Sequence, residues 1–259
     1  MKRKHSRLAF KFIIGFELLG ILICAVSSGI GFFQFKSHIE KQYNDTAYDI
    51  AAVAQTYIGI EKLNEYTEAA IAYEKGEISK QQINQYKMED TYQQVKEKLV
   101  NLREKMGAND IFMVYVDQKI MNTYDSNWTE EQLEQWKPTL YIFDAYKVED
   151  ECFQLGDTAR FNPAFIEDTV KLFKTGERPE NYFISESNFG YNTSAMLPVV
   201  YNGKVIAAIG VEVPMTHIKS VLRQYIWYAV CVTVLLIILV ITVYMFYLYR
   251  SVIRPINKI

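Results

Sequence analysis

The sequence predicts an α+β protein in which two transmembrane helices flank an outer domain, itself built from a long N-terminal helix and an antiparallel sheet. Hydrophobic residues make up 50% of the 259 residues, yet the mean hydropathy is only −0.06. Such a composition requires very apolar stretches beside very polar ones. Two apolar runs lie near the ends of the chain. The polar segment between them begins with a helical period and ends with alternating strands.

The two apolar runs are long enough to cross a membrane. Residues 12–33 form a run of 22 with Glu17 as its one charged residue, and residues 225–249 form a run of 25 without charge. At 1.5 Å per residue they reach about 33 and 37 Å, against a hydrocarbon core of about 30 Å. A cleaved signal peptide is the alternative for the first run, but its apolar character continues past the small-residue step Ala25-Val26-Ser27. We therefore expect an uncleaved anchor.

The placement of Lys and Arg predicts the orientation. Eight of the 28 basic residues lie in 1–11 and 250–259, outside the two runs. Segment 36–224 holds the other 20 together with 29 of the 30 acidic residues, a formal charge of −9. Because Lys and Arg gather on the cytoplasmic side of a membrane, both termini are expected in the cytoplasm, with the acidic segment outside the inner (plasma) membrane.

Five parts follow from this division of a multi-pass chain. They are a basic cytoplasmic N-terminus (1–11), a first transmembrane helix (12–35), an extracytoplasmic domain (36–224), a second transmembrane helix (225–249) and a short basic segment (250–259). The extracytoplasmic domain contains one cysteine, Cys152, so it cannot close a disulfide within itself. Its 189 residues are enough to bury a hydrophobic core.

Helical patterns open the outer domain. Apolar or small residues recur every three or four positions from Ile39 to Tyr57, the period of one helix face. A second helix is expected from Ser79, a suitable N-cap, to Met106, with Gly107 as its stop. The run IFMVYV (111–116) is then typical of a buried strand, and Asp117-Gln118 is expected to turn it into KIMNTY. A polar, Trp-containing stretch follows from Asp125 to Pro138, and the segment from there to Asp157 is interpreted as irregular.

The rest of the outer domain predicts one short helix and three strands. The helix covers 163–174 and is closed by Gly176, and the strands cover 181–187, 191–201 and 204–213. Asn202-Gly203 joins the last two strands, a sequence typical of a type I′ hairpin turn because both central residues need φ > 0. Pro198 cannot donate to a β-ladder, so its strand is expected to be an edge or bulged there.

The order of these elements resembles a known family. The stretch ESNFGYNTSAMLPVVYNGKVIAAIGVEVPM, the short helix THIKSVL, the second apolar run and IRPINKI together are similar to a bacterial extracytoplasmic Cache sensor, a PAS-like domain, followed by a HAMP linker. The most telling part is a proline-containing strand, a glycine turn and a final Gly-Val-acid-hydrophobic strand. In HAMP linkers a proline directly after the span opens the first helix, which matches Arg254-Pro255-Ile256.

The resemblance implies a transmembrane signal-transduction receptor. Its outer domain would bind a small molecule, and its second span would signal through the HAMP linker to cytoplasmic signalling proteins or an output module beyond Ile259, as in chemotaxis or two-component systems. Such receptors commonly work as parallel homodimers embedded in membrane lipid, and Ser27-x-x-x-Gly31 could allow close helix approach. The alternative is a two-span regulatory or binding protein without its own output domain.

Five residues are candidates for ligand contact. The resemblance implies a ligand against the sheet, and an amino acid or a small organic acid is the hypothesis. Arg160 could capture a carboxylate in a bidentate way, although a surface ion pair with Asp157 is the favoured interpretation. Tyr141, Tyr191 and Thr193 could supply a wall and hydroxyl groups, and Asp125 could meet an amine.

Catalysis finds little support in the sequence. The three histidines are His5, His38 and His217, and no phosphate loop, HExxH, GxSxG or paired-cysteine metal motif occurs. An enzyme anchored by two helices is therefore disfavoured. No catalytic residue, metal, cofactor or nucleic-acid partner is expected within this chain. Glu17 lies about one turn inside the membrane, where a carboxylate is costly.

Overall fold

The structure is a computed structural model, and it describes residues 2–146, 148–179, 183–187, 190–248 and 250. The chain forms two compact units. One unit comprises Met1–Ile39 together with His217–Ile259, and the other comprises Glu40–Thr216. Residues 251–259, where the HAMP linker is predicted, lie outside the described residues, as does the side chain of Glu17.

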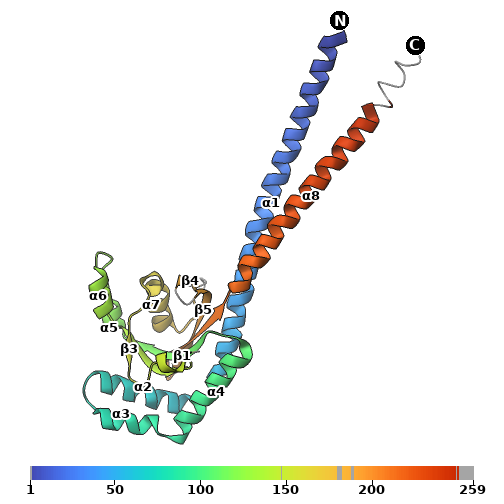
Figure 1. Ribbon diagram of the computed structural model, residues 1–259. Helices are drawn as coiled ribbons and strands as arrows, with labels where there is room; N and C mark the ends of the chain where they lie inside the picture. Colours follow the sequence, from blue (N-terminus) through green and yellow to red (C-terminus); the bar gives the residue numbers. More distant parts are fainter. Residues whose placement is uncertain (1, 147, 180–182, 188–189, 249, 251–259) are drawn as a thin grey trace. The chain divides into compact units, whose positions relative to one another are not determined.

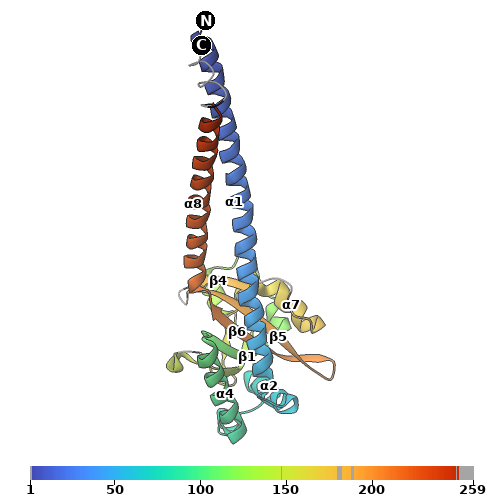
Figure 2. The same ribbon diagram turned by 90° about the vertical axis from the view of Figure 1, so that its right-hand side faces the viewer.

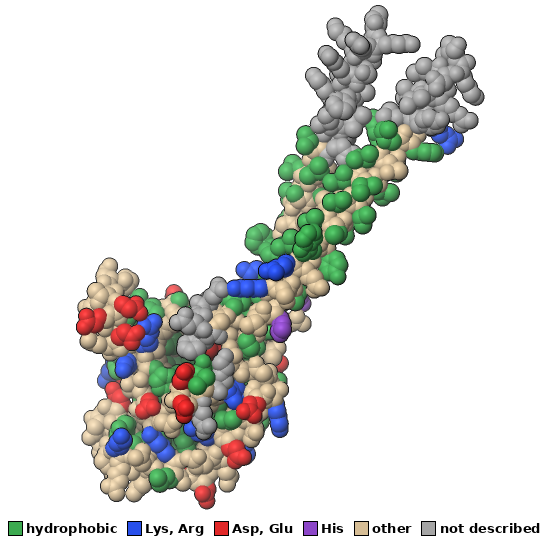
Figure 3. All heavy atoms as spheres, viewed as in Figure 1, with side chains coloured by type: hydrophobic (Ala, Val, Ile, Leu, Met, Phe, Trp, Pro, Cys, Tyr) green, Lys and Arg blue, Asp and Glu red, His purple; other side chains and the backbone are tan. Residues whose placement is uncertain are grey.

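The first unit consists of two apolar helices. α1 (Lys2–Gln55) supplies its first part and α8 (Thr216–Leu248) its second, and both helices are long and apolar enough to span a membrane. Hydrophobic side chains cover the visible surface of this unit in Figure 3, with Leu235 65% exposed. Water would solvate such a surface poorly, whereas lipid tails suit it.

The two helices lie side by side (Figures 1 and 2), and aromatic packing joins them. The ring of Tyr225 in α8 stacks on Phe35 of α1 with centroids 5.0 Å apart. A Cβ atom at Gly31 would overlap the Tyr225 hydroxyl, so the missing side chain makes room for this contact. Gly31 of the predicted small-residue motif thus packs against a helix of its own chain.

Four helices cover one side of the sheet in the second unit. The end of α1 is joined there by α2 (Ile60–Glu74), α3 (Lys80–Lys87) and α4 (Asp90–Met106). The predicted helix from Ser79 to Met106 is wrong as one piece, because Glu89 adopts extended backbone angles and caps a new helix. Its two ends are confirmed. Ser79 forms a capping box with Gln82, and Gly107 takes the left-handed conformation.

The sheet has six antiparallel strands in the order β3-β2-β1-β6-β5-β4. Their bounds are Asp110–Val116 (β1), Thr139–Asp144 (β2), Thr158–Ala159 (β3), Phe183–Ser187 (β4), Gly190–Tyr201 (β5) and Lys204–Pro214 (β6). The sequence prediction missed β2, whose residues TLYIFD were interpreted as irregular. Buried on both faces, β2 lacks the alternation that marks a strand.

The predicted hairpin between β5 and β6 is confirmed. Asn202 and Gly203 have φ of 49° and 74°, the signs that a type I′ turn requires. Pro198 pairs with Ala208 of β6, while the described pairs of β4 reach only to Ser194. The ladder is irregular directly after Pro198, between Val199 and Val200. At Pro198 the strand is therefore locally an edge among the described residues, one of the two predicted outcomes, whereas the extra residue of the irregularity is Ile206 on β6.

Short helices cover the other side of the sheet (Figure 1). They are α5 (Gln118–Met121), α6 (Glu130–Gln135), the 3₁₀ turn Pro163–Phe165 and α7 (Ile166–Thr175), with a further 3₁₀ turn at Glu149–Glu151. Asp117 does not turn a hairpin. Its carboxylate accepts hydrogen bonds from the N–H groups of Lys119 and Ile120 and so caps α5.

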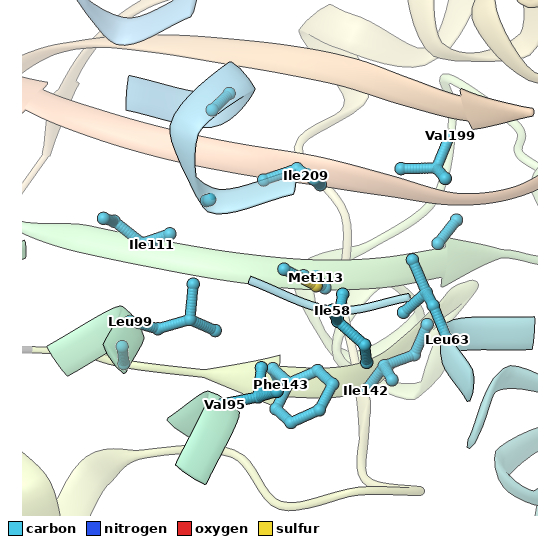
Figure 4. Packing of buried hydrophobic residues seen from close by; sticks show 14 of the residues in the cluster. Ile58, Leu63, Val95, Leu99, Ile111, Met113, Ile142, Phe143, Val199 and Ile209 are labelled. Atoms are coloured by element: carbon cyan, nitrogen blue, oxygen red, sulfur yellow. The ribbon is translucent and has the colours of Figure 1, made fainter. Parts of the chain in front are cut away.

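Each face of the sheet therefore has its own hydrophobic cluster. We call the side covered by α1 to α4 the helix face, and the side covered by α5 to α7 the cavity face. Figure 4 shows part of the helix-face core, where Leu99 of α4 meets Ile111 and Met113 of β1. The smaller cluster on the cavity face includes Val114 and Met196. Alternate residues of one strand serve the two clusters.

Candidate ligand-binding cavity

A cavity of about 430 Å³ lies on the cavity face, wholly within the unit Glu40–Thr216. This volume is within the usual range for small-molecule sites, roughly 300 to 1,000 Å³. Strands supply its floor, and residues 160–165, which connect β3 to α7, supply one wall. The floor residues are Phe112, Val114, Ser194, Met196 and Glu212.

Glycine 210 shapes the cavity floor. It lies on β6 opposite Phe112 of β1, and a Cβ atom there would overlap the Phe112 ring. The ring therefore lies directly over the strand, which leaves space above it. Tyr141 of β2 lies beside Phe112 with ring centroids 6.0 Å apart and stacks on Phe153 at 4.2 Å. These contacts hold two aromatic faces at the cavity. Burial, reinforced by the nearby Asp110, raises the pKa of the Tyr141 hydroxyl.

Two polar groups stand out among the apolar lining. Thr139 of β2 is only 5% exposed, and its hydroxyl has no hydrogen-bond partner among the described residues. Glu212 of β6 is half-buried at the same cavity. Burial, and secondarily the charge of Asp144, raises the pKa of the Glu212 carboxyl. A buried hydroxyl without a partner costs roughly 1–3 kcal/mol, so Thr139 is a group that a ligand could satisfy.

Two more carboxyl groups lie beside Glu212. Asp110 pairs with Glu212 across the strands, and its side chain hydrogen bonds to Asp144. Asp144 also accepts hydrogen bonds from the N–H groups of Tyr146 and Phe153, at 2.9 and 2.6 Å. Burial raises the pKa of both Asp110 and Asp144; the charge of Asp144 raises the pKa of Asp110 further, whereas the two backbone hydrogen bonds lower that of Asp144. The Oδ1 atom of Asp110 has no partner among the described residues.

Two of the five sequence-predicted site residues line this cavity, Tyr141 and Arg160. Arg160 is 51% exposed at the rim, and it pairs with Glu130 at 2.9 Å and with Glu134 at 2.5 Å, both on α6. The surface ion pair with Asp157, which was the favoured interpretation of Arg160, is not the one formed. The Asp157 carboxylate instead accepts a hydrogen bond from the N–H of Gln154.

The other three predicted residues lie elsewhere. Thr193 is on the helix face of β5, where its hydroxyl accepts a hydrogen bond from Asn44 of α1 at 3.1 Å. Tyr191 is on the same face, and its hydroxyl donates to Glu40. Asp125 is exposed in a turn, and its carboxylate accepts hydrogen bonds from the backbone and side chain of Asn127. None of the three lines the cavity.

Sequence reasoning missed Thr139, Glu212 and Phe112. A signal for Glu212 was present, since in KVIAAIGVEV it is the one acidic residue and shares a strand face with Ala208 and Gly210. Thr139 gave no such signal because its strand was not recognised. Phe112 looks like any core aromatic in the run IFMVYV.

No protein-family model matches this chain, and no curated protein matches it. Among solved structures, the sensor domain of the V. cholerae histidine kinase DctB is similar, with 12% identity, a TM-score of 0.38 and coverage of 73% of this chain. The ligand-binding domain of the Campylobacter jejuni chemoreceptor Tlp3, solved with 4-methylisoleucine, matches with 13% identity, a TM-score of 0.30 and the same coverage. This chain spans 57% and 62% of those two chains.

Proposed function

We propose that this chain is a transmembrane receptor whose outer domain binds a small molecule in the cavity and signals through α8. The observation that carries the proposal is a cavity of ligand size on one face of a sheet, whose strands lie between two apolar helices in the sequence. The cavity is lined in part by β6, which is followed after Met215 by α8. Ligand contacts on β6 therefore act on the strand that leads into a membrane helix.

The remaining features of the receptor are part of the same proposal. The charge asymmetry supports an extracytoplasmic domain at the inner membrane, with both termini in the cytoplasm. Signal transfer requires a shift of only about 1–2 Å, because packed helices have discrete alternative positions. A parallel homodimer, a HAMP linker from residue 250 and a cytoplasmic output module complete the receptor. The role of the chain itself is binding, without catalysis.

The ligand is proposed to be an amino acid or a small organic acid. Tyr141 supplies an aromatic wall, and Arg160 stands at the rim as a carboxylate contact. To bind a carboxylate, Arg160 can exchange Glu130 or Glu134 for the ligand, since both ion pairs are made by its Nη1 atom. Exposed ion pairs are worth only about 0–1 kcal/mol, so this exchange is energetically accessible.

The test is calorimetry on the full chain in lipid nanodiscs, with the twenty amino acids and a set of two- to six-carbon organic acids. Gly210→Ala pushes the Phe112 ring into the cavity and is expected to abolish binding while the fold is kept. Gly59→Ala is the control, since a Cβ there meets nothing within 4 Å. Binding that survives Gly210→Ala unchanged would place the ligand elsewhere. Unchanged affinity in Arg160→Ala would remove Arg160 from the site.

Orientation is tested separately in intact cells. Asn127 is exposed in the outer unit, so Asn127→Cys in a chain whose native cysteines are replaced by serine or alanine offers an accessible thiol. A membrane-impermeant maleimide is expected to label it without cell lysis. Labelling only after lysis would contradict the proposed topology.

A further inference from the structure

We propose that the groove between α1 and α8 binds an anionic phospholipid, with an acyl chain in the groove and the phosphate against Lys36, Lys219 and Arg223. The lipid class is a phospholipid of net negative charge, such as phosphatidylglycerol. The inference goes beyond ligand binding in the cavity. It shares with the proposed function only the premise that the two apolar helices span a membrane.

The groove has the chemistry and the depth that an acyl chain needs. Its volume is about 410 Å³, and it lies wholly within the unit formed by the two apolar helices. The hydroxyl of Thr233 in its lining already donates to the carbonyl of Ala229, so the surface there is effectively apolar. On α1 the lining extends from Ile21 to Phe32, a rise of about 16 Å. This is about half of a hydrocarbon core of about 30 Å, so the groove has the depth of one leaflet.

On both helices the groove-lining stripe continues into basic residues. Residues three or four positions apart share a helix face. The lining residues of α1 recur at this spacing, and the next position in their series is Lys36, after Ile21, Ala25, Ser28 and Phe32. On α8, Ile226 of the lining is preceded at the same spacing by Arg223 and Lys219. Stacking of Phe35 on Tyr225 joins the helices at this end, so the three cations lie at one end of the groove.

This end of the helix pair is basic, whereas the outer domain is acidic. Segment 36–224 has a formal charge of −9, yet residues 34–39 and 216–224 contain three Lys and Arg residues and no Asp or Glu. Trp227 and Tyr228 lie directly below Arg223 in the sequence and are 65% and 66% exposed. Such side chains mark the interface between membrane and water. The three cations are therefore at the level of the lipid headgroups, where Lys and Arg attract anionic lipids.

Charge also favours a lipid over a second copy of the chain in this groove. A parallel copy seated there would bring its own Lys36, Lys219 and Arg223 to the same level. Like charges placed together oppose association. An anionic headgroup is complementary to the same three residues, and its acyl chain fills the apolar part of the groove. A parallel homodimer would therefore use another face of the helix pair.

The first test compares two lipid probes on the full chain in phosphatidylcholine nanodiscs. Spin-labelled phosphatidylglycerol and spin-labelled phosphatidylcholine with the same acyl chains are added in turn, and electron paramagnetic resonance measures the fraction immobilised by the protein. The ratio of the two association constants is expected to favour phosphatidylglycerol by at least about 5-fold, the ratio that about 1 kcal/mol produces. A ratio near 1 in the wild type would overturn the inference.

Two pairs of variants test the headgroup contact and the groove. Lys219→Gln/Arg223→Gln is expected to bring the ratio close to 1, whereas Lys80→Gln/Lys105→Gln, which removes two exposed charges from the outer unit, should leave it unchanged. Gly29→Leu fills the groove, and a Cβ there meets nothing within 4 Å, so fewer phosphatidylglycerol molecules should be immobilised. Gly20→Leu is the matched control, since its Cβ is equally unhindered and Gly20 does not line the groove. A variant pair that behaves alike would contradict the contact it tests.

A cross-linking experiment decides between the lipid and a second copy. Ala25 lines the groove, so Ala25→Cys in a chain whose native cysteines are replaced reports on the occupant. Disulfide-linked dimers on oxidation in nanodiscs would show that a second copy occupies the groove and would overturn the inference. None of these measurements needs a ligand in the cavity. Failure of the lipid tests therefore leaves the proposed cavity intact, and failure of the cavity tests leaves the lipid site intact.

Discussion

The two faces of the sheet differ in how completely they are packed. On the helix face, four helices bury a continuous core in which Leu99, Ile111 and Met113 are fully inaccessible. On the cavity face, a smaller cluster surrounds a space of about 430 Å³. The same strand takes part in both, since Ile209 and Val211 of β6 face the helices and Gly210 and Glu212 face the cavity. The closely packed helix face stabilises the fold, so the cavity face can keep space for a ligand.

Buried polar groups on the two faces can also be compared by their hydrogen bonds. On the helix face Asn44 bonds to Thr193, and the Tyr92 hydroxyl donates to the backbone carbonyl of Ile142. On the cavity face Thr139 and Asp110 have buried oxygen atoms without a partner among the described residues. The helix side is not fully paired either, since the Tyr48 hydroxyl of α1, whose ring lies under Arg178, and the Nε atom of Arg103 of α4 also lack a partner among the described residues. Unsatisfied groups beside a cavity are costs that a ligand can remove.

The largest effect is expected from the helix face. Leu99→Ala removes a fully buried side chain and should lower the free energy of unfolding by about 2–5 kcal/mol. Met106→Ala on the same helix is the control, because Met106 is 48% exposed, and it should cost about 0.5 kcal/mol or less. Urea unfolding followed by tryptophan fluorescence measures both. Similar costs for the two variants would contradict the packing contrast.

A smaller loss is expected from the polar contact of the helix face. Asn44 donates to Thr193 Oγ1 and to the carbonyl of Ser194, at 3.1 and 3.3 Å, and it is buried. Asn44→Ala leaves these acceptors unpaired and should cost about 1–3 kcal/mol. Asn64→Ala, which removes an exposed bond to Glu68 within α2, should cost about 0.5 kcal/mol or less. Equal unfolding midpoints for the two variants would show that burial does not set the cost.

The sequence predicts the helix face better than the cavity face. Helix ends at Ser79 and Gly107 and the turn at Asn202-Gly203 follow from local backbone chemistry, which is written in adjacent residues. The break at Glu89 and the strand β2 depend on tertiary packing, because α4 and β2 are placed by what buries them.

Sequence-based prediction of the site residues meets the same limit, because it depends on tertiary packing. Alternation along β5 places Thr193 and Ser194 on opposite faces, but it does not say which face is hollow. Thr193 was therefore predicted at the ligand site, although it faces α1. Arg160 lines the cavity, yet its partners Glu130 and Glu134 lie 26 to 30 residues away in the sequence and could not be identified from spacing.

On the cavity face, charge removal is expected to stabilise the fold. The folded pKa of Asp110 is raised above its ordinary value, so the folded state binds this proton more tightly, and stability falls as pH rises from about 4 through the folded pKa. Asp110→Asn should therefore be more stable than the wild type near pH 8, by about 1.4 kcal/mol for each unit of that raise.

Neighbouring titratable groups also contribute to the pH dependence of stability in the Asp110→Asn variant. Asp144 and Glu212 also have raised pKa values, mainly through burial, while Lys96 acts against the raise at Asp144, so part of the pH dependence should remain. Tyr141, Tyr146 and Cys152 face the same cluster and titrate only at higher pH. Asp45→Asn, an exposed site on α1, is the control. An Asp110→Asn variant that loses stability at every pH would show that Asp110 is a structural hydrogen-bond partner instead.

The smallest effect is expected at the rim. Arg160 is half-exposed, and its pairs with Glu130 and Glu134 are accessible to solvent, so Arg160→Ala should change the free energy of unfolding by less than about 1 kcal/mol. The same variant removes the carboxylate contact proposed at the rim, so ligands with a carboxylate should bind more weakly, most visibly at low salt. Calorimetry at two salt concentrations measures this. A large loss of stability would mean that the rim stabilises the fold as the helix face does. The contrast between a stabilising helix face and a ligand-binding cavity face would then not hold at the rim.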